Sequence, residues 1–189
     1  MALISDIDAK PDHSLALSIH LGGMLVVAGN ETGLVAFEKA VAGDGNRTAL
    51  RLPNHAAFHT SLMADVAEMG RTALPQELFA DPHTALIDGR GHIWQPAACD
   101  LTSLRNYTLG HQITETYDFT AAVRAAARNF APDRFIITGP GTTLGSAVAQ
   151  ALISINWQGI DSKAAFQARQ ADTPLVISMG RADQRALAL

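Results

Sequence analysis

The segment 52–63 holds residue types that could do chemistry, because it presents a histidine where a helix is expected to begin. A short apolar strand leads into a loop that ends at His59, and Thr60 and Ser61 are of the types that cap a helix N-terminus. Loops carry reactive groups because a rigid scaffold can aim them at a ligand, and a neutral imidazole can act there as a general base. The spacing by itself favours a plainer interpretation, a histidine whose hydrogen bonds are satisfied locally.

Composition limits the class of protein. Hydrophobic residues make up 48% of the 189 positions and charged residues 17%, so we expect a sizeable core in one domain or in a domain plus a small subdomain. A net charge of −4 argues against nucleic acid and against an anionic membrane as partners. No apolar run reaches the roughly 20 residues that span a bilayer, and the N-terminus has no signal-peptide pattern, so a cytoplasmic protein is expected.

The single cysteine, Cys99, excludes an internal disulfide and fits a reducing compartment. Reactive thiols need electropositive surroundings, and no basic cluster lies near Cys99 in the sequence. We therefore interpret Cys99 as a packing residue rather than as a nucleophile.

The elements that must position His59 can be read from periodicity and turn residues. Before the histidine, helices are expected over residues 2–9 and 34–41, and strands over residues 14–19, 24–28 and 48–52, the second of these strands being buried. This β-β-α-β order resembles the later part of a ferredoxin-like unit. After the histidine, one helix is expected to run to about residue 69, and further helices over 101–109, 119–130 and 142–155. Short strands or a hairpin are expected over 84–88 and 92–94, and strands over 134–138 and 174–178. The pattern weakens beyond residue 157, and residues 181–185 are expected to be a loose end or a terminal helix.

Residues 139–145, Gly-Pro-Gly-Thr-Thr-Leu-Gly, follow an expected strand and precede an expected helix. Such a turn can bind a phosphate, but its glycines are one residue off the dinucleotide fingerprint and the acidic residue of that fold is missing. A nucleophile elbow with Thr143 in the serine position is disfavoured, because the glycines already make the turn and Thr143 is expected inside the helix. The favoured interpretation is a glycine turn that lets a helix and a sheet pack closely.

The His59 loop resembles the histidine loop of the malonyl-CoA:acyl-carrier-protein transacylases and of polyketide synthase acyltransferase domains, which ends in Phe-His or Ser-His followed by Leu-Met. Phe58-His59 occupy the first pair and residues 62–63 the second. The resemblance implies that His59 is the general base and then the general acid of acyl transfer, and that Phe58 shapes the acyl pocket. A phenylalanine there favours malonyl over methylmalonyl, because its ring fills the space of the extra methyl group. Ala56 departs from the motif, which often has a histidine there, and Asn54 is a further predicted substrate-binding residue.

Gln112 is the second catalytic residue that the resemblance implies. Leaving the resemblance aside, we would expect Gln112 to lie on the surface or at a helix end. In the transacylases a glutamine or asparagine before a Pro-Val-x-Trp/Phe helix start accepts, through its main-chain carbonyl, a hydrogen bond from the catalytic imidazole. Gln112 precedes residues 116–119 at the matching distance, with Thr116 in place of the proline. An acceptor on one ring nitrogen fixes the tautomer and leaves the other nitrogen to take a proton. The adjacent His111 is interpreted as packing or exposed.

The sequence lacks a part that this mechanism requires. The transacylases use an acyl-serine on a Gly-x-Ser-x-Gly elbow and an arginine that binds the malonyl carboxylate, and no Gly-x-Ser-x-Gly occurs in the 189 residues. In the family both groups lie upstream of the ferredoxin-like insert. We therefore predict that the chain is a fragment, the later half of a transacylase. The alternative is a short homologue that takes its nucleophile from a complementary chain or has lost activity.

These inferences combine into one prediction. The fold class is α/β, with an incomplete ferredoxin-like small subdomain over residues 1–52 and the later part of a transacylase-type, α/β-hydrolase-like core over residues 53–189. The predicted reaction is malonyl transfer from malonyl-CoA to an acyl carrier protein, in fatty acid biosynthesis or polyketide synthesis, with no metal or other cofactor. Two alternatives remain open: a non-catalytic module that binds a carrier protein or a half-enzyme, and a hydrolase that releases the free acid.

Overall fold

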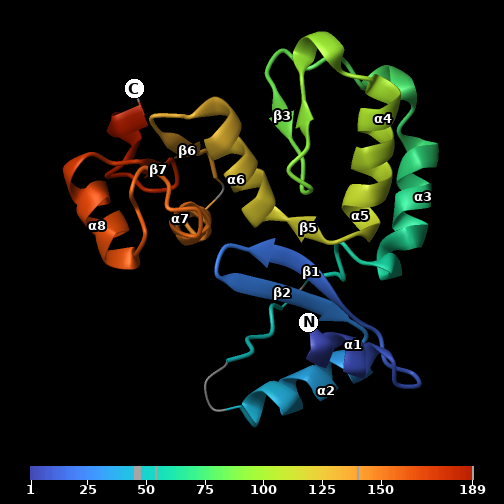
Figure 1. Ribbon diagram of the computed structural model, residues 1–189. Coiled ribbons are helices and arrows are strands. Elements are labelled where there is room, and N and C mark those ends of the chain that lie inside the picture. Colours follow the sequence, from blue (N-terminus) through green and yellow to red (C-terminus); the bar gives the residue numbers. More distant parts are fainter. Residues whose placement is uncertain (45–47, 54, 140, 189) are drawn as a thin grey trace. The chain divides into compact units, whose positions relative to one another are not determined.

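The strands of the protein form three small sheets in the described part of the chain (Figure 1). The computed structural model describes residues 1–44, 48–53, 55–139 and 141–188. Contacts divide the chain into two units: the first holds Met1–His20, Leu25–Ala85 and Trp94–Tyr117, and the second holds Leu21–Met24, Leu86–Ile93 and Asp118–Leu189. The domain boundary predicted after residue 52 lies within the first unit and stays a prediction.

The first unit begins with a helix, a hairpin and a second helix. These are α1 (Ala2–Asp8), β1 (Leu15–Leu21), β2 (Met24–Gly29) and α2 (Glu31–Ala42). A third, short strand, β5 (Tyr117–Asp118), pairs with β1, so the order in the sheet is β2-β1-β5. The buried apolar side chains of α1 and β1 form one core cluster, made of Ile4, Ile7, Leu15 and Leu17. This cluster fixes β1, the strand from which Ser18 reaches the His59 loop.

The rest of the first unit is mainly helical and carries that loop. A 3-10 turn, η1 (Ser61–Met63), leads into α3 (Ala64–Ala73). Helix α4 (Leu101–Asn106), a π-helical turn η4 (Tyr107–His111) and α5 (Gln112–Thr114) follow one another directly. Short 3-10 turns occupy Gln76–Leu78 and Pro96–Ala98. The Arg105 guanidinium donates to the carbonyls of Arg71 (2.6 Å) and Leu74 (2.7 Å), which satisfies carbonyls at the end of α3 and ties α4 to it.

The second unit packs helices on a small parallel sheet. Its helices are α6 (Phe119–Phe130), α7 (Leu144–Ile153) and α8 (Lys163–Asp172), and its parallel strands are β6 (Phe135–Ile137) and β7 (Val176–Ser178). In the register of the two strands, Phe135 lies opposite Val176 and Ile137 opposite Ser178. Buried core residues come from both helices and strands, among them Val123, Ala127, Val148, Leu152 and Val176. The chain closes with a 3-10 turn, η5 (Arg185–Ala188). A hairpin of β3 (Leu86–Ile87) and β4 (Ile93–Trp94) precedes α4 in the sequence.

Two expectations about these elements are wrong, and one helix was not predicted. Residues 48–52 form no strand, and the third strand of this sheet is β5, which pairs with β1. Strand β2 forms but is not buried: Met24 and Leu25 are 52% and 53% exposed, because β2 is the edge strand of a small sheet rather than a strand covered on both faces. Helix α8 was not predicted, because none of its residues is buried and it therefore has no apolar stripe.

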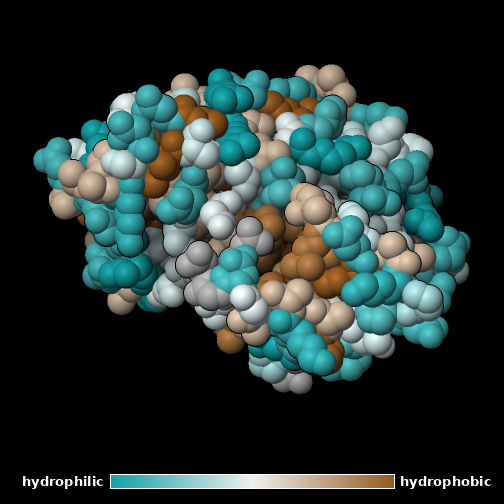
Figure 2. Space-filling view, turned by 60° about the horizontal axis from the view of Figure 1, so that its bottom comes forward, coloured by the Kyte–Doolittle hydropathy of each residue, from teal (hydrophilic) through white to brown (hydrophobic). Residues whose placement is uncertain are grey.

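The surface mixes hydrophilic and hydrophobic groups. None of the described helices is long and apolar enough to cross a membrane. Large apolar side chains are nevertheless exposed, among them Leu50, Met69, Leu78 and Ile136. Figure 2 shows hydrophobic groups, in brown, at several places among hydrophilic ones, in teal.

Candidate active site

The backbone of His59 is left-handed. Its φ is +59°, in the region that residues with a side chain rarely adopt. Such a conformation costs about 1–3 kcal/mol and persists only where the surroundings fix it, and strain of this kind clusters at functional sites. The conformation therefore supports a functional role for His59, and it is a signal that the sequence pattern does not contain.

The imidazole of His59 is hydrogen-bonded to a main-chain oxygen. Its Nδ1 lies 2.5 Å from the carbonyl oxygen of Gln112. A carbonyl oxygen can only accept, so Nδ1 carries the proton and donates it. In the neutral ring the lone pair is then on Nε2, which is the nitrogen that can take a proton from a substrate or nucleophile. The contact implied by the resemblance is present, whereas the catalytic roles of His59 and Gln112 stay predictions.

The Gln112 carbonyl is available because the helix ends just beyond it. Helix α5 ends at Thr114, so Gln112 lies in the last turn, whose carbonyls lack partners inside the helix. The preceding carbonyl, that of His111, accepts from the Glu115 amide at 2.9 Å. The carbonyl end of a helix carries partial negative charge, which favours the proton on the facing Nδ1. A π-helical turn, a feature often found at functional sites, lies immediately before Gln112.

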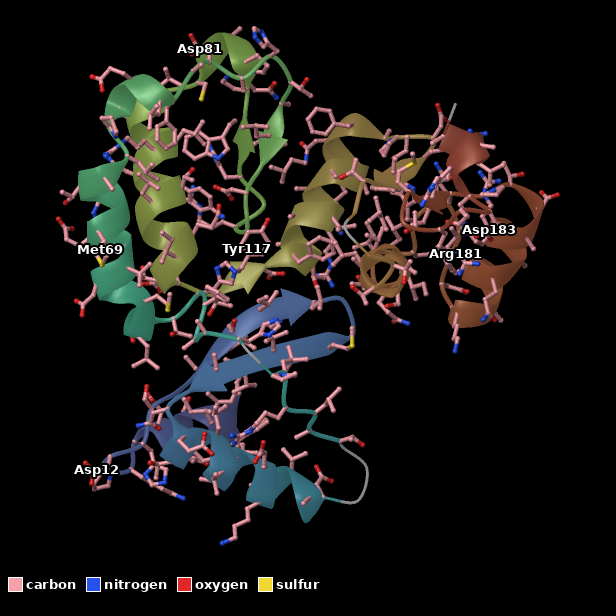
Figure 3. All side chains as sticks on the ribbon, turned by 180° about the vertical axis from the view of Figure 1, so that it is seen from behind. Asp12, Met69, Asp81, Tyr117, Arg181 and Asp183 are labelled. Carbon is pink, nitrogen blue, oxygen red and sulfur yellow. The ribbon has the colours of Figure 1, made fainter. Side chains whose placement is uncertain are left out.

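Tyr117 packs beside the imidazole of His59. The centroids of the two rings are 5.3 Å apart and their planes are tilted by 41°. Tyr117 belongs to β5 and is labelled in Figure 3. His111, by contrast, stacks on Tyr107 with ring centroids 5.6 Å apart, which agrees with its interpretation as a packing residue.

The loop around His59 is held differently from the sequence expectation. Thr60 does not cap the following helix with its side chain; its hydroxyl donates instead to the Ala57 carbonyl, at 2.7 Å. Thr60 occupies the N-cap position of the 3-10 turn η1 and Ser61 lies inside it, so Thr60 is at the expected position but neither residue caps the helix with its side chain. The hydroxyl of Ser18, on β1, donates to the Phe58 carbonyl at 2.8 Å. Sequence reasoning missed Ser18, because it lies 40 positions from Phe58 and no local pattern links the two.

The other predicted residues are less informative. Phe58 is next to His59 and 48% exposed, and its part in an acyl pocket stays a prediction. Asn54 lies outside the described residues. Cys99 is a free thiol of intermediate exposure. Among the residues that the structure describes, no three His, Cys, Asp or Glu side chains are placed to hold a metal ion.

The glycine turn before α7 is not a nucleophile elbow. Gly139 and Gly141 have φ of +104° and +79°, whereas Thr143 has φ −81° and ψ −28°, an ordinary helical conformation. The nucleophile of an elbow sits on the strained turn itself, and Thr143 does not. A Cβ at Gly180 would lie 2.0 Å from the Gly141 carbonyl oxygen, so the turn packs closely against the chain after β7. These contacts agree with the packing interpretation; Pro140 lies outside the described residues.

The fold of the chain is that of acyltransferase domains, as the sequence predicted. Similar solved structures include FabD from Acinetobacter baumannii, with a TM-score of 0.71 and 18% identity, over 99% of this chain and 52% of that one. The malonyl-CoA:acyl carrier protein transacylase of Xanthomonas oryzae has a TM-score of 0.73 and 17% identity, over 100% and 53%. The acyltransferase domain from the second module of the salinomycin polyketide synthase has a TM-score of 0.67 and 18% identity, over 98% and 38%. The chain thus spans about half the length of the transacylases. No protein-family model matches the sequence, and no curated protein matches it.

Proposed function

We propose that this chain provides the histidine part of an acyltransferase that moves a malonyl group from coenzyme A to an acyl carrier protein. The observation that carries the proposal is the hydrogen bond from His59 Nδ1 to the Gln112 carbonyl, within an acyltransferase fold. It leaves Nε2 as a base on a loop whose strained backbone is typical of functional sites. Phe58 then favours malonyl over larger acyl groups by filling space beside the acyl group.

In the proposed reaction, His59 moves one proton back and forth. Nε2 takes the hydroxyl proton of a serine as the serine oxygen attacks the thioester carbonyl; the carbon–sulfur bond breaks, and the coenzyme A thiolate leaves with that proton. In the second half, Nε2 takes the proton of the carrier thiol, the thiol attacks the acyl-serine ester, and the serine oxygen recovers the proton. The Gln112 carbonyl stabilises the imidazolium formed in each half. No metal or redox cofactor takes part.

The serine and the arginine for the malonyl carboxylate are supplied, in this proposal, by sequence outside the 189 residues, since no Gly-x-Ser-x-Gly occurs within them. Incubation of the chain alone with malonyl-CoA, followed by intact mass spectrometry, should therefore show no covalent malonyl adduct. An adduct would place the nucleophile inside the chain and contradict this part of the proposal.

The test of catalysis is a chimera in which this chain replaces the matched half of the Acinetobacter baumannii protein. Transfer of malonyl from malonyl-CoA to a pantetheinylated carrier protein should be detectable. His59→Ala should lower its rate by about 10²–10⁴-fold, as expected for loss of a general acid–base group. A chimera that unfolds cooperatively but is never acylated would overturn the proposal.

The second candidate is a non-catalytic module that binds a carrier protein or a half-enzyme. The absence of Gly-x-Ser-x-Gly from the sequence favours it. It predicts that the chain binds a carrier protein, and that the His59→Ala substitution leaves the affinity unchanged. The catalytic proposal predicts instead that the same substitution sharply lowers the rate of transfer by the chimera.

A further inference from the structure

Two hydroxyl groups hold the two peptide groups that precede His59, those of the Ala57 and Phe58 carbonyls. The Ser18 hydroxyl donates to the Phe58 carbonyl at 2.8 Å, and the Thr60 hydroxyl donates to the Ala57 carbonyl at 2.7 Å. Both side chains are almost fully buried, at 3% exposure each. A buried carbonyl that loses its donor is costly, so these two bonds oppose any rotation that would turn the carbonyls away.

The position of these bonds matters because one of the two held peptide groups leads directly into His59. The peptide group that joins Phe58 to His59 is planar, so the direction of the Phe58 carbonyl also sets the direction of the His59 amide. The left-handed φ of +59° at His59 is then defined relative to a peptide that Ser18 fixes. Thr60 follows His59 in the sequence, and its hydroxyl holds the earlier peptide group, between Ala57 and Phe58, which closes the turn over residues 57–60.

We infer that Ser18 and Thr60 are positioning residues that hold His59 in its left-handed conformation and so aim Nδ1 at the Gln112 carbonyl. Their relevance to acyl transfer rests on the proposed function, but their effect on the ring does not. Both hydroxyls donate to main-chain carbonyls and not to the imidazole, so both residues act on the ring through the main chain. Without them, the loop should relax to an ordinary backbone conformation, and the ring should lose its acceptor.

The experiment observes the ring itself. In the chain labelled with ¹⁵N-histidine, long-range ¹H–¹⁵N correlation distinguishes the two imidazole tautomers, and loss of one signal in His59→Gln assigns it to residue 59. The wild-type ring should be the Nδ1–H tautomer with a slowly exchanging Nδ1 proton. Ser18→Ala and Thr60→Val should each lose at least half of that proton signal and give a mixture of tautomers.

Two variants serve as matched controls. Thr60→Ser keeps the hydroxyl and should retain the wild-type signal. Ser14→Ala removes a hydroxyl just before the same strand, one to which the described structure assigns no hydrogen bond, and should also retain it. Amide spectra establish that each variant is folded. If Ser18→Ala does not fold, Thr60→Val decides the matter, and if neither folds, the hydroxyls support the whole unit and the inference is wrong.

Failure of this inference can be told apart from failure of the proposed function. Folded Ser18→Ala and Thr60→Val chains that keep the wild-type Nδ1–H signal would overturn the positioning role, whatever the chimera does. Loss of the signal in both variants, together with a folded chimera that never transfers malonyl, would uphold positioning and reject the transferase. In an active chimera, Ser18→Ala should lower kcat with little change in KM and should alter the pH profile, which loss of stability alone would not do.

Discussion

At the scale of single residues, the partner of His59 is a main-chain oxygen rather than a carboxylate. A neutral carbonyl fixes the tautomer through geometry, and it is supplied by the backbone whatever side chain residue 112 carries. The identity of the side chain at position 112 should therefore matter much less than the course of the helix that ends there. The side chain at position 112 therefore gives little signal in the sequence, although the hydrogen bond from His59 Nδ1 to the carbonyl of that residue is short.

Gln112→Ala should preserve the hydrogen bond of His59. The carbonyl remains, and alanine favours the helical conformation at least as well as glutamine. The Nδ1–H proton signal of His59, observed by ¹H–¹⁵N correlation, should keep its wild-type intensity and chemical shift. Disappearance of the signal in a folded Gln112→Ala chain would show that the glutamine side chain orients the ring.

Asp88 gives a second residue-scale prediction, because its carboxylate organises the turn between β3 and β4. Burial works to raise the pKa of Asp88, but hydrogen bonds from the Arg90 side chain and from the amides of Arg90 and His92 outweigh it, so the pKa lies below its ordinary value. A lowered folded pKa contributes stability above the unfolded value, near 4, and that contribution is lost as the pH falls through the lower folded value.

Asp88→Asn should therefore lower the free energy of unfolding at pH 7 by about 1–2 kcal/mol, through loss of charge-assisted hydrogen bonds. Urea unfolding of both proteins between pH 7 and about pH 2.5 would measure the difference, which should shrink below about pH 4 as the wild-type carboxylate is protonated. A difference that is independent of pH would contradict the proposed role of the charge.

At the scale of elements, the π-helical turn η4 sets the direction in which the Gln112 carbonyl points. Successive residues of a helix are rotated by about 100°, so one residue more or less before Gln112 redirects everything after it. Gly110 lies inside η4 and is buried. A Cβ added at Gly110 would meet the end of the flexible Arg71 side chain, Nη1, at 3.2 Å.

Deletion of Gly110 should convert the π-helical turn into a regular helix and abolish the Nδ1–H signal of His59. Gly110→Ala is the matched control, because it keeps the residue count and meets only the tip of a flexible side chain. It should retain the signal. If the deletion variant also retains it, the π-helical turn does not determine the position of the carbonyl.

The elements also show how far sequence reasoning reached. Helix α6 has the predicted bounds, 119–130, because an apolar stripe and the capping Asp118 mark it locally. Helix α8 was missed because it buries no residue, and only its cap, Ser162, which accepts from the Ala165 amide, gives a local signal. The predicted strand over 48–52 does not form, because a strand needs a neighbouring strand to pair with, and in this sheet β1 pairs with β2 and β5. At the site, the contact was suggested by the resemblance of the His59 loop and of residues 112–119 to the transacylases, since spacing alone did not single out Gln112. The left-handed backbone of His59 and the anchoring by Ser18 were not predicted, because they depend on residues distant in sequence.

At the scale of the whole molecule, the parallel sheet of the second unit has two different edges. Alternate residues of a parallel strand bond to the same neighbour. The Phe135 amide donates to the Leu175 carbonyl and the Met179 amide to the Ile137 carbonyl, so Ile136 faces away from β7. On β7, the outer groups are covered by side-chain amides: Gln170 Oε1 accepts from the Leu175 and Val176 amides, and Gln184 Oε1 accepts from the Ser178 amide.

The two edges should differ in hydrogen exchange, because among the described residues glutamine side chains replace a neighbouring strand along β7 and not along β6. The Val176 and Ser178 amides should exchange slowly, and the Ile136 amide, on a residue that is 49% exposed, should exchange fast. Gln170→Ala should speed exchange at Val176 by about fivefold, the equivalent of about 1 kcal/mol for one hydrogen bond. The Met179 amide, which bonds to β6, should be unaffected and serves as the internal control.

Residue-resolved exchange by NMR would measure all of these amides together. If Ile136 exchanged as slowly as Met179, the edge of β6 would be covered in solution, and the asymmetry argued from the glutamines would be wrong.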